Sequence, residues 1–165
     1  NEEKTKKLIQ AQKRHMHIGV PGHGIVIAVP IKSVGGGKTV AFLNGETDNA
    51  AYTPSLNYAH ELIVAVCSQG CTDMVMNAAR AAGARGGTVL HGKGTGAKGA
   101  PKFYNITIAQ EKEMILIVAA ASQKTAIMQS ILKKAGPDSK AGTIVFSLPT
   151  TQVAGFALLD NQDET

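Results

Sequence analysis

The residues best suited to chemistry lie in one glycine-rich segment between two apolar stretches. Residues 91–99 read His-Gly-Lys-Gly-Thr-Gly-Ala-Lys-Gly. Glycine lets successive backbone N–H groups converge on an oxyanion, and Lys93 and Lys98 add positive charge. The segment is not a P-loop, because no Gly-Lys-Ser/Thr sequence opens a helix there. It therefore predicts either a loop that binds an anion or a solvated hairpin tip.

A second kind of glycine-rich turn occurs twice, each time between a helical pattern and a strand pattern. The copies are 19–24 (Gly-Val-Pro-Gly-His-Gly) and 136–142 (Gly-Pro-Asp-Ser-Lys-Ala-Gly). A helix stop followed by a turn is the simpler interpretation of each copy. Such a turn and the segment 91–99 could also meet around a phosphate chain, particularly across a subunit interface.

Histidine and cysteine residues supply no recognisable catalytic or metal-binding pattern. His15 and His17 would share a face of a strand but not of a helix, and no Cys or carboxylate stands at a standard ligand spacing. Three residues separate Cys67 from Cys71, which favours packing over a thiol switch. No Ser/His/Asp set or carboxylate pair stands out. The sequence predicts no catalytic residues, no metal site and no enzymatic activity, with a metal-binding protein as the alternative.

The composition narrows the function classes further. Hydrophobic residues make up 44% of the 165 and charged residues 18%, which is typical of a globular protein. The sequence has no apolar run of about 18 residues, so it predicts no membrane span. Two cysteines favour a reducing, cytoplasmic setting. A net charge of +5 suits a small anionic effector, whereas 4% aromatic residues and no Trp argue against nucleic-acid binding.

The elements that must position these residues follow from hydrophobic periodicity between Glu61 and Gly155. Continuous or alternating apolar stretches predict strands, 3.6-residue periodicity predicts helices, and 110–112 is expected to be a turn. The strands are expected at 62–67, 88–90, 114–120 and 143–148, and the helices at 72–82 and 123–135. The order βαββαβ predicts an α+β, ferredoxin-like fold with an antiparallel sheet and two helices on one face.

An internal repeat indicates that the first residues belong to another copy of this domain. At a spacing of 119 positions, several identical or similar residues fall in register along a helix, a turn and a strand. The pairs are Leu8-Ile9 with Ile127-Met128, Gln10 with Gln129, Ile25-Val26 with Ile144-Val145, Pro30 with Pro149, Val34 with Val153 and Gly36 with Gly155. We therefore expect a tandem repeat whose first copy is incomplete in this sequence, with a further strand–helix–strand ahead of it.

The expected domain organisation follows from this repeat. Residues 1–36 are interpreted as the second half of a first repeat, 37–59 as a linker, 60–156 as the complete domain and 157–165 as a C-terminal tail.

Between Glu61 and about Gly155 the chain resembles the nitrogen-regulatory P-II signalling proteins. Four stretches carry the resemblance. They are Leu62–Ala82 followed by Gly87-Thr88-Val89, the loop base Gly92-Lys93-Gly94 with Lys98-Gly99, the apolar strand Met114–Ala120, and the helix, glycine turn and strand from Gln123 to Pro149. The sequence departs from the family pattern at Thr95 and Gly96, which replace the usual Arg and Gln, and at His23, where Asp is usual. It also lacks the tyrosine that some members carry in the loop.

The resemblance implies a homo-oligomer, trimeric in the family, that binds a small anionic effector between subunits. The expected effector is an adenine nucleotide such as ATP or ADP, and a T-loop-like loop is expected to signal to a protein target. By correspondence with the family, the expected ligand-binding residues are Thr88, Gly92, Lys93, Gly94, Thr95 and Lys98, the second turn's Lys140 and Gly142, and the first turn's Gly22, His23 and Gly24.

Overall fold

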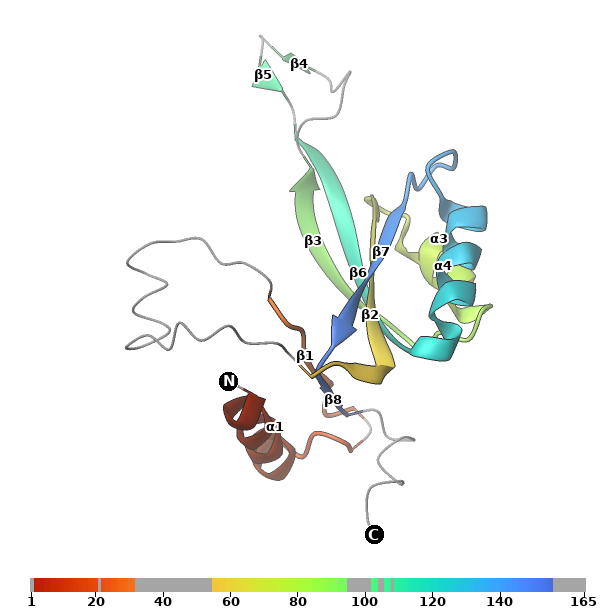
Figure 1. Cartoon of the computed structure of the whole chain (residues 1–165). Helices are drawn as coiled ribbons and strands as arrows, with labels where there is room; N and C mark the ends of the chain where they lie inside the picture. Colours follow the sequence, from red (N-terminus) through yellow and green to blue (C-terminus); the bar gives the residue numbers. More distant parts are fainter. Residues whose placement is uncertain are drawn as a thin grey trace. The chain divides into compact units, whose positions relative to one another are not determined.

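The chain divides into two compact units, one of residues 1–57 with 149–165 and one of residues 58–148 (Figure 1). The computed structural model describes residues 2–20, 22–31, 55–94, 102–103, 106–107 and 109–155. Most of the predicted linker and the predicted C-terminal tail lie outside these residues. None of the described helices combines the length and apolar character needed to cross a membrane.

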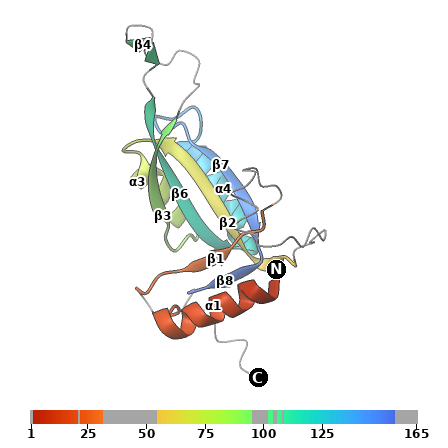
Figure 2. The same ribbon diagram turned by 90° about the vertical axis from the view of Figure 1, so that its left-hand side faces the viewer.

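The second unit has the βαββαβ order that the sequence predicts. Its elements are β2 (Asn57–Ser68), α3 (Thr72–Arg80), β3 (Thr88–Gly94), β6 (Gln110–Ala120), α4 (Ala121–Ala135) and β7 (Ile144–Thr150). The strands lie side by side in the order β3-β6-β2-β7, and β6 runs antiparallel to both β2 and β3. A separate antiparallel pair joins β4 (Lys102–Phe103) to β5 (Ile106–Thr107). Helices α3 and α4 cover one face of the four-stranded sheet (Figure 2), so the predicted ferredoxin-like fold is confirmed.

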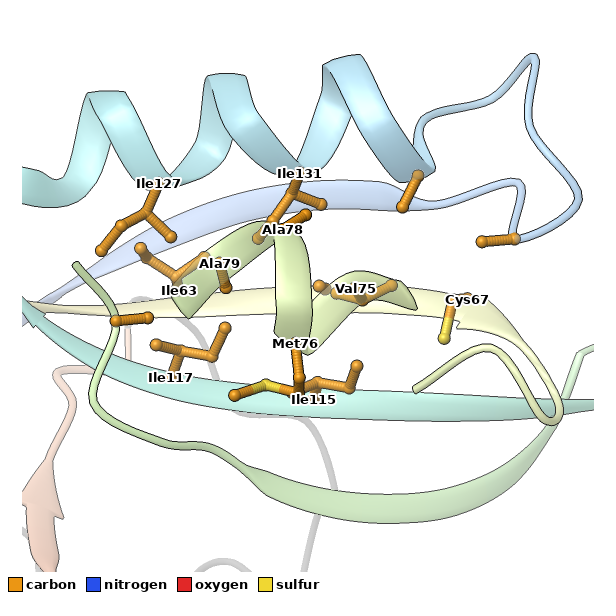
Figure 3. Packing of buried hydrophobic residues seen from close by; sticks show 14 of the residues in the cluster. Ile63, Cys67, Val75, Met76, Ala78, Ala79, Ile115, Ile117, Ile127 and Ile131 are labelled. Atoms are coloured by element: carbon orange, nitrogen blue, oxygen red, sulfur yellow. The ribbon is translucent and has the colours of Figure 1, made fainter. Parts of the chain in front are cut away.

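The hydrophobic core lies between this sheet and its two helices. Alternate residues of β2 and β6 point toward the helices, because successive side chains of a strand face opposite sides. These side chains meet the apolar faces of α3 and α4 with almost no solvent exposure (Figure 3). The largest members are Ile63, Ile115, Ile117, Val75, Ile127 and Ile131.

The opposite face of the sheet is also apolar, although α3 and α4 do not lie on it. Four of its larger side chains keep 39–65% of their surface exposed: Leu90, Met114, Ile144 and Phe146. Leu90 and Met114 are direct cross-strand neighbours between β3 and β6. We call these four residues the helix-free face. Polar residues normally occupy the solvated face of an antiparallel sheet, so this pattern is typical of a surface that another element covers.

Strands β3 and β6 are longer than the sequence predicts. Residues 110–112, expected to be a turn, begin β6, and the glycine-rich loop was expected to start at Gly92. Instead Gly92 pairs with Lys112, and Gly94 pairs with Gln110. Polar residues and glycines lack the apolar alternation that marks a strand. Backbone pairing between segments distant in sequence extends both strands regardless.

The described residues of the first unit form one helix and a two-stranded ribbon. The helix α1 spans Glu2–Met16, and β1 (Val26–Ala28) pairs antiparallel with β8 (Gln152–Ala154). Ile9 of α1 packs with Ile18 and Ala154 to form a small core. The expected helix and strand are therefore present within residues 3–36, whereas the tandem-repeat interpretation stays a prediction.

A buried carboxylate from β6 holds the N-terminus of α3 in place. Cys71, which precedes the helix, makes no side-chain capping bond. Glu113 accepts bonds from the Thr72 hydroxyl, from the Gly70 N–H at 3.1 Å and from the Thr72 N–H at 3.2 Å. These bonds hold the pKa of Glu113 below its usual range despite the burial of its side chain, and the bond from the Thr72 hydroxyl contributes most. The carboxylate thereby satisfies the N–H of Thr72, which has no partner within the helix, and ties the preceding turn to β6 through Gly70.

Shortening the side chain of Ile117 in the core should cause a large loss of stability. Replacing Ile117, which is fully buried, with Ala should lower the free energy of unfolding by about 2–5 kcal/mol, because the cavity is lined on every side. Leu132→Ala is the matched control, since Leu132 is 46% exposed on α4 and should cost much less. Urea unfolding measures both, and equal losses would contradict this description of the core.

Glu113 should make stability depend on pH. Because the folded state lowers its pKa, Glu113 stabilises the protein above the carboxyl's unfolded pKa, and this contribution is lost as pH falls through the folded pKa. Glu113→Gln should therefore cost about 1–3 kcal/mol at pH 7, and the difference from wild type should shrink below about pH 4.3. Glu111→Gln, at a half-exposed carboxylate on the same strand, should cost much less at pH 7. A pH-independent difference in urea-unfolding energies would refute this assignment.

Candidate functional site

Two turns and a loop base gather at one end of the four-stranded sheet. Strands β2 and β3 end there, and β6 and β7 begin there. The Ser68 N–H at the end of β2 donates to the Ala141 carbonyl at 2.9 Å, and the Gln69 N–H donates to the Glu111 carbonyl at 3.4 Å. The turn before β7 and the turn after β2 are thus held side by side. This end of the sheet contains five of the eleven residues that the sequence indicates for ligand binding, namely Gly92, Lys93, Gly94, Lys140 and Gly142.

The loop base consists of the last three residues of β3. Lys93 is 69% exposed and lies 3.6 Å from the carboxylate of Glu111. Gly92 has open space where a side chain would lie, whereas a Cβ on Gly94 would approach Lys112 Cγ to 3.0 Å. A side chain at Gly94 would therefore require the Lys112 side chain to shift. The loop base therefore offers a cation and uncovered backbone at the point where the chain leaves the sheet.

The turn between α4 and β7 is held by its own hydrogen bonds. The Ser139 hydroxyl donates to the Gly136 carbonyl at 2.8 Å and accepts from the Ala141 N–H at 3.2 Å. Gly142 has a φ of 54°, in the left-handed region that favours glycine. Lys140, which lies between Ser139 and Gly142 in the sequence, is exposed. The turn therefore presents a lysine from a preorganised backbone.

Strand order keeps the loop base and this turn apart within one domain. Strands β3 and β7 are the two outer strands, with β6 and β2 between them. Three inter-strand spacings amount to about 14 Å. A small anion held by the loop base of one domain is therefore beyond the reach of the same domain's turn at Gly142.

Thr88 lies at the other end of β3 from the loop base. Gly94 lies six positions after Thr88, which corresponds to about 20 Å along a strand. Thr88 is exposed and pairs with Leu116. The structure therefore does not bring Thr88 together with the loop base of its own domain. Thr95 and Lys98 lie outside the described residues.

The first glycine-rich turn belongs to the other unit. Gly22 and Gly24 have φ values of 89° and 98°, and the His23 N–H donates to the Val20 carbonyl at 3.0 Å. The rings of His17 and His23 meet edge to face with centroids 6.2 Å apart. Within the described ranges, however, no three His, Cys, Asp or Glu side chains cluster in a way that could hold a metal ion.

Glu113 is a polar neighbour of His91 that the sequence did not single out. His91 Nε2 lies 3.8 Å from Glu113 Oε1, across the β3–β6 ladder. His91 is 70% exposed, whereas the Glu113 side chain is only 9% exposed. A carboxylate immediately before the apolar run 114–120 was the signal that could have drawn attention to it. The pair places a titratable imidazole beside the loop base.

The two cysteines contribute to packing. Both thiols are free and buried. Burial, reinforced by the negative charge of Glu113, raises the pKa of Cys67 to about 11. Such a thiol stays protonated at neutral pH and is a poor nucleophile. This favours the packing role over a thiol switch.

Comparison with known proteins identifies the family. A family model described as "Nitrogen regulatory protein P-II" matches residues 60–156. Among solved structures, the chain is similar to Arabidopsis thaliana PII bound to citrate, with 20% sequence identity and a TM-score of 0.43 over 55% of this chain and 77% of that one. A comparison with curated proteins gave no match. Since the family model covers more than half of the chain, this protein belongs to the nitrogen regulatory protein P-II family.

Proposed function

We propose that this protein is a non-enzymatic signalling protein of the nitrogen-regulation type. It binds a small anionic effector, with an adenine nucleotide as the first candidate, and signals to a protein target through the loop that follows Gly94. One observation carries this proposal, namely the match to the P-II family over residues 60–156. The lysines and glycines at one end of the sheet support it, because the lysines offer positive charge and Gly92 and Gly142 leave open space beside the backbone for an anion to approach.

The proposed effector site lies between two copies of the domain. The loop base of one copy supplies Lys93 and the uncovered backbone at Gly92. The turn with Lys140 and Gly142 comes from a neighbouring copy. This arrangement is supported by the separation of about 14 Å between the two segments within one domain. A ligand that bridges two copies would also couple effector binding to the position of the loop.

Assembly into a homo-oligomer is part of the same proposal. The helix-free face exposes Leu90, Met114, Ile144 and Phe146. Burial of such side chains is favourable by about 25 cal/mol per Å² of apolar surface. We propose that equivalent faces of other copies cover it, with the number of domains a multiple of three.

Effector binding should depend on lysines at both proposed halves of the site. Lys98→Ala and Lys140→Ala should each weaken nucleotide binding by about 1–3 kcal/mol, because each removes a charged hydrogen-bond donor. Isothermal titration calorimetry with ATP, ADP and a cyclic nucleotide measures the effect. Lys133→Ala is the matched control, since Lys133 is exposed in the last turn of α4 and should leave binding unchanged.

The same titration separates the proposal from the metal-binding alternative. Heat from Zn²⁺ or Cu²⁺ without heat from any nucleotide, lost on His23→Asn, would favour a metal-binding protein. No binding of any nucleotide, or an equal loss in Lys133→Ala, would refute the proposed site.

The proposed assembly should depend on the helix-free face. Phe146→Glu should dissociate the assembly, because a carboxylate buried without a partner is strongly unfavourable. Leu132→Glu adds the same charge at a similarly exposed position on the helical side and should leave assembly intact. Multi-angle light scattering measures the mass of each variant. A wild-type monomer at micromolar concentration would contradict the proposed assembly.

A further inference from the structure

The two longest helices among the described residues match in length and register. Helix α1 spans Glu2–Met16 and α4 spans Ala121–Ala135, so both have 15 residues. Their first and last residues are each separated by 119 positions, which is the spacing found in the sequence repeat. Strand β1 falls at the same spacing from residues 145–147 within β7. Each residue of α1 therefore has a defined counterpart in α4.

The inner face of α4 is the side that packs against the rest of the second unit, and the inner face of α1 is the side that carries the counterparts of those residues. One half of this face is covered in both helices. Ile9 is 6% exposed and packs against residues of the β1–β8 ribbon, including Val26 and Ala28. Its counterpart Met128 is half-buried and packs against the main core. This half of the face is therefore packed against other elements in each unit.

The other half of the inner face is covered only in α4. Ile127 is fully buried, and the Ser130 hydroxyl donates to the Ala78 carbonyl of α3 at 2.7 Å. Their counterparts on α1 are Leu8, which is 60% exposed, and Ala11, which is also exposed. The difference lies on the side of the helix that meets a neighbouring helix in the second unit.

Two further residues on the inner face of α1 lack the environment of their counterparts. Met16 is 58% exposed, whereas Ala135 is fully buried. Gln12 stands where α4 has the buried Ile131, and its amide oxygen is buried without a hydrogen-bond partner in the described part of the chain. Such an atom costs free energy until a donor reaches it.

We propose that the Leu8 side of α1 is the docking surface for a helix from a strand–helix–strand element of the same polypeptide. This element resembles residues 57–94, and together with α1 and β1 it completes a second P-II-like domain. Ala11, in the place of Ser130, provides the small side chain that lets two helices approach closely. The element's strands extend the β1–β8 ribbon, because two strands of three residues each are marginally stable without more.

The first test is the intact mass of the natural gene product. Subtracting the 119-residue spacing from Glu61 places its counterpart about 59 positions ahead of Asn1. Mass spectrometry should therefore give a value that exceeds 17.2 kDa by at least the mass of that many residues. A product of 17.2 kDa that begins at Asn1 would overturn the proposal.

The second test asks whether the Leu8 side of α1 is covered in that product. Leu8→Glu should speed amide hydrogen exchange across α1 at least tenfold, because it places a charge in the proposed helix–helix contact. Gln10→Glu is the matched control, since it adds the same charge to an exposed position of the same helix. Equal exchange in the two variants would overturn the proposal even if the product is longer.

Ala11→Leu provides a further test that does not depend on whether Leu8→Glu folds. Leucine is a good helix former, so at an uncovered position this change should leave the thermal midpoint unchanged. Against a docked helix it overpacks the contact and should lower the midpoint by several degrees. An unchanged midpoint in the natural product would overturn the proposal. In the 165-residue chain, protection of α1 from amide hydrogen exchange that rises with protein concentration would also overturn the proposal. It would identify a second copy of the chain as the occupant of the Leu8 side.

Discussion

Strand β6 is the element on which the rest of the second unit depends. It pairs with β2 from His60 opposite Ala120 to Ser68 opposite Lys112, and its other edge pairs with the whole of β3. This double pairing determines which side chains face the helices, because a shift of one residue would turn every side chain of β6 to the other face. The core and the polar end of the sheet are therefore consequences of one register.

The same register links stability to the candidate site. It places Glu113 opposite His91 and beneath the N-terminus of α3, where the carboxylate accepts bonds from Gly70 and Thr72. It also places Lys112 within 3.2 Å of the Ser68 hydroxyl. The backbone from which the loop departs is thus braced by side chains of the central strand. A loop that changes conformation on binding an effector needs such a rigid base.

Both faces of the sheet are apolar, and this connects the fold to the proposed assembly. One face is covered by α3 and α4, and the other carries the four exposed apolar side chains of the helix-free face. The first unit shows a related feature on a smaller scale, since α1 buries Ile9 and exposes Leu8. In each unit the exposed apolar side chains lie on a surface that the described elements leave open. Association with further domains is the simplest way to bury them.

The sequence by itself determined the order of elements and the core. The continuous apolar runs at 62–67 and 114–120 and the helical spacing of Val75, Ala78 and Ala79 are local patterns, and the structure confirms the strands, the helices and the buried helix face that they predict. Only the tertiary structure decided that Gly92–Gly94 belong to a strand, that Glu113 caps α3 and that the loop base lies about 14 Å from the turn at Gly142. The physical reason is the distance in sequence between the interacting groups, because Glu113 and Gly70 are 43 positions apart and no local pattern records their contact.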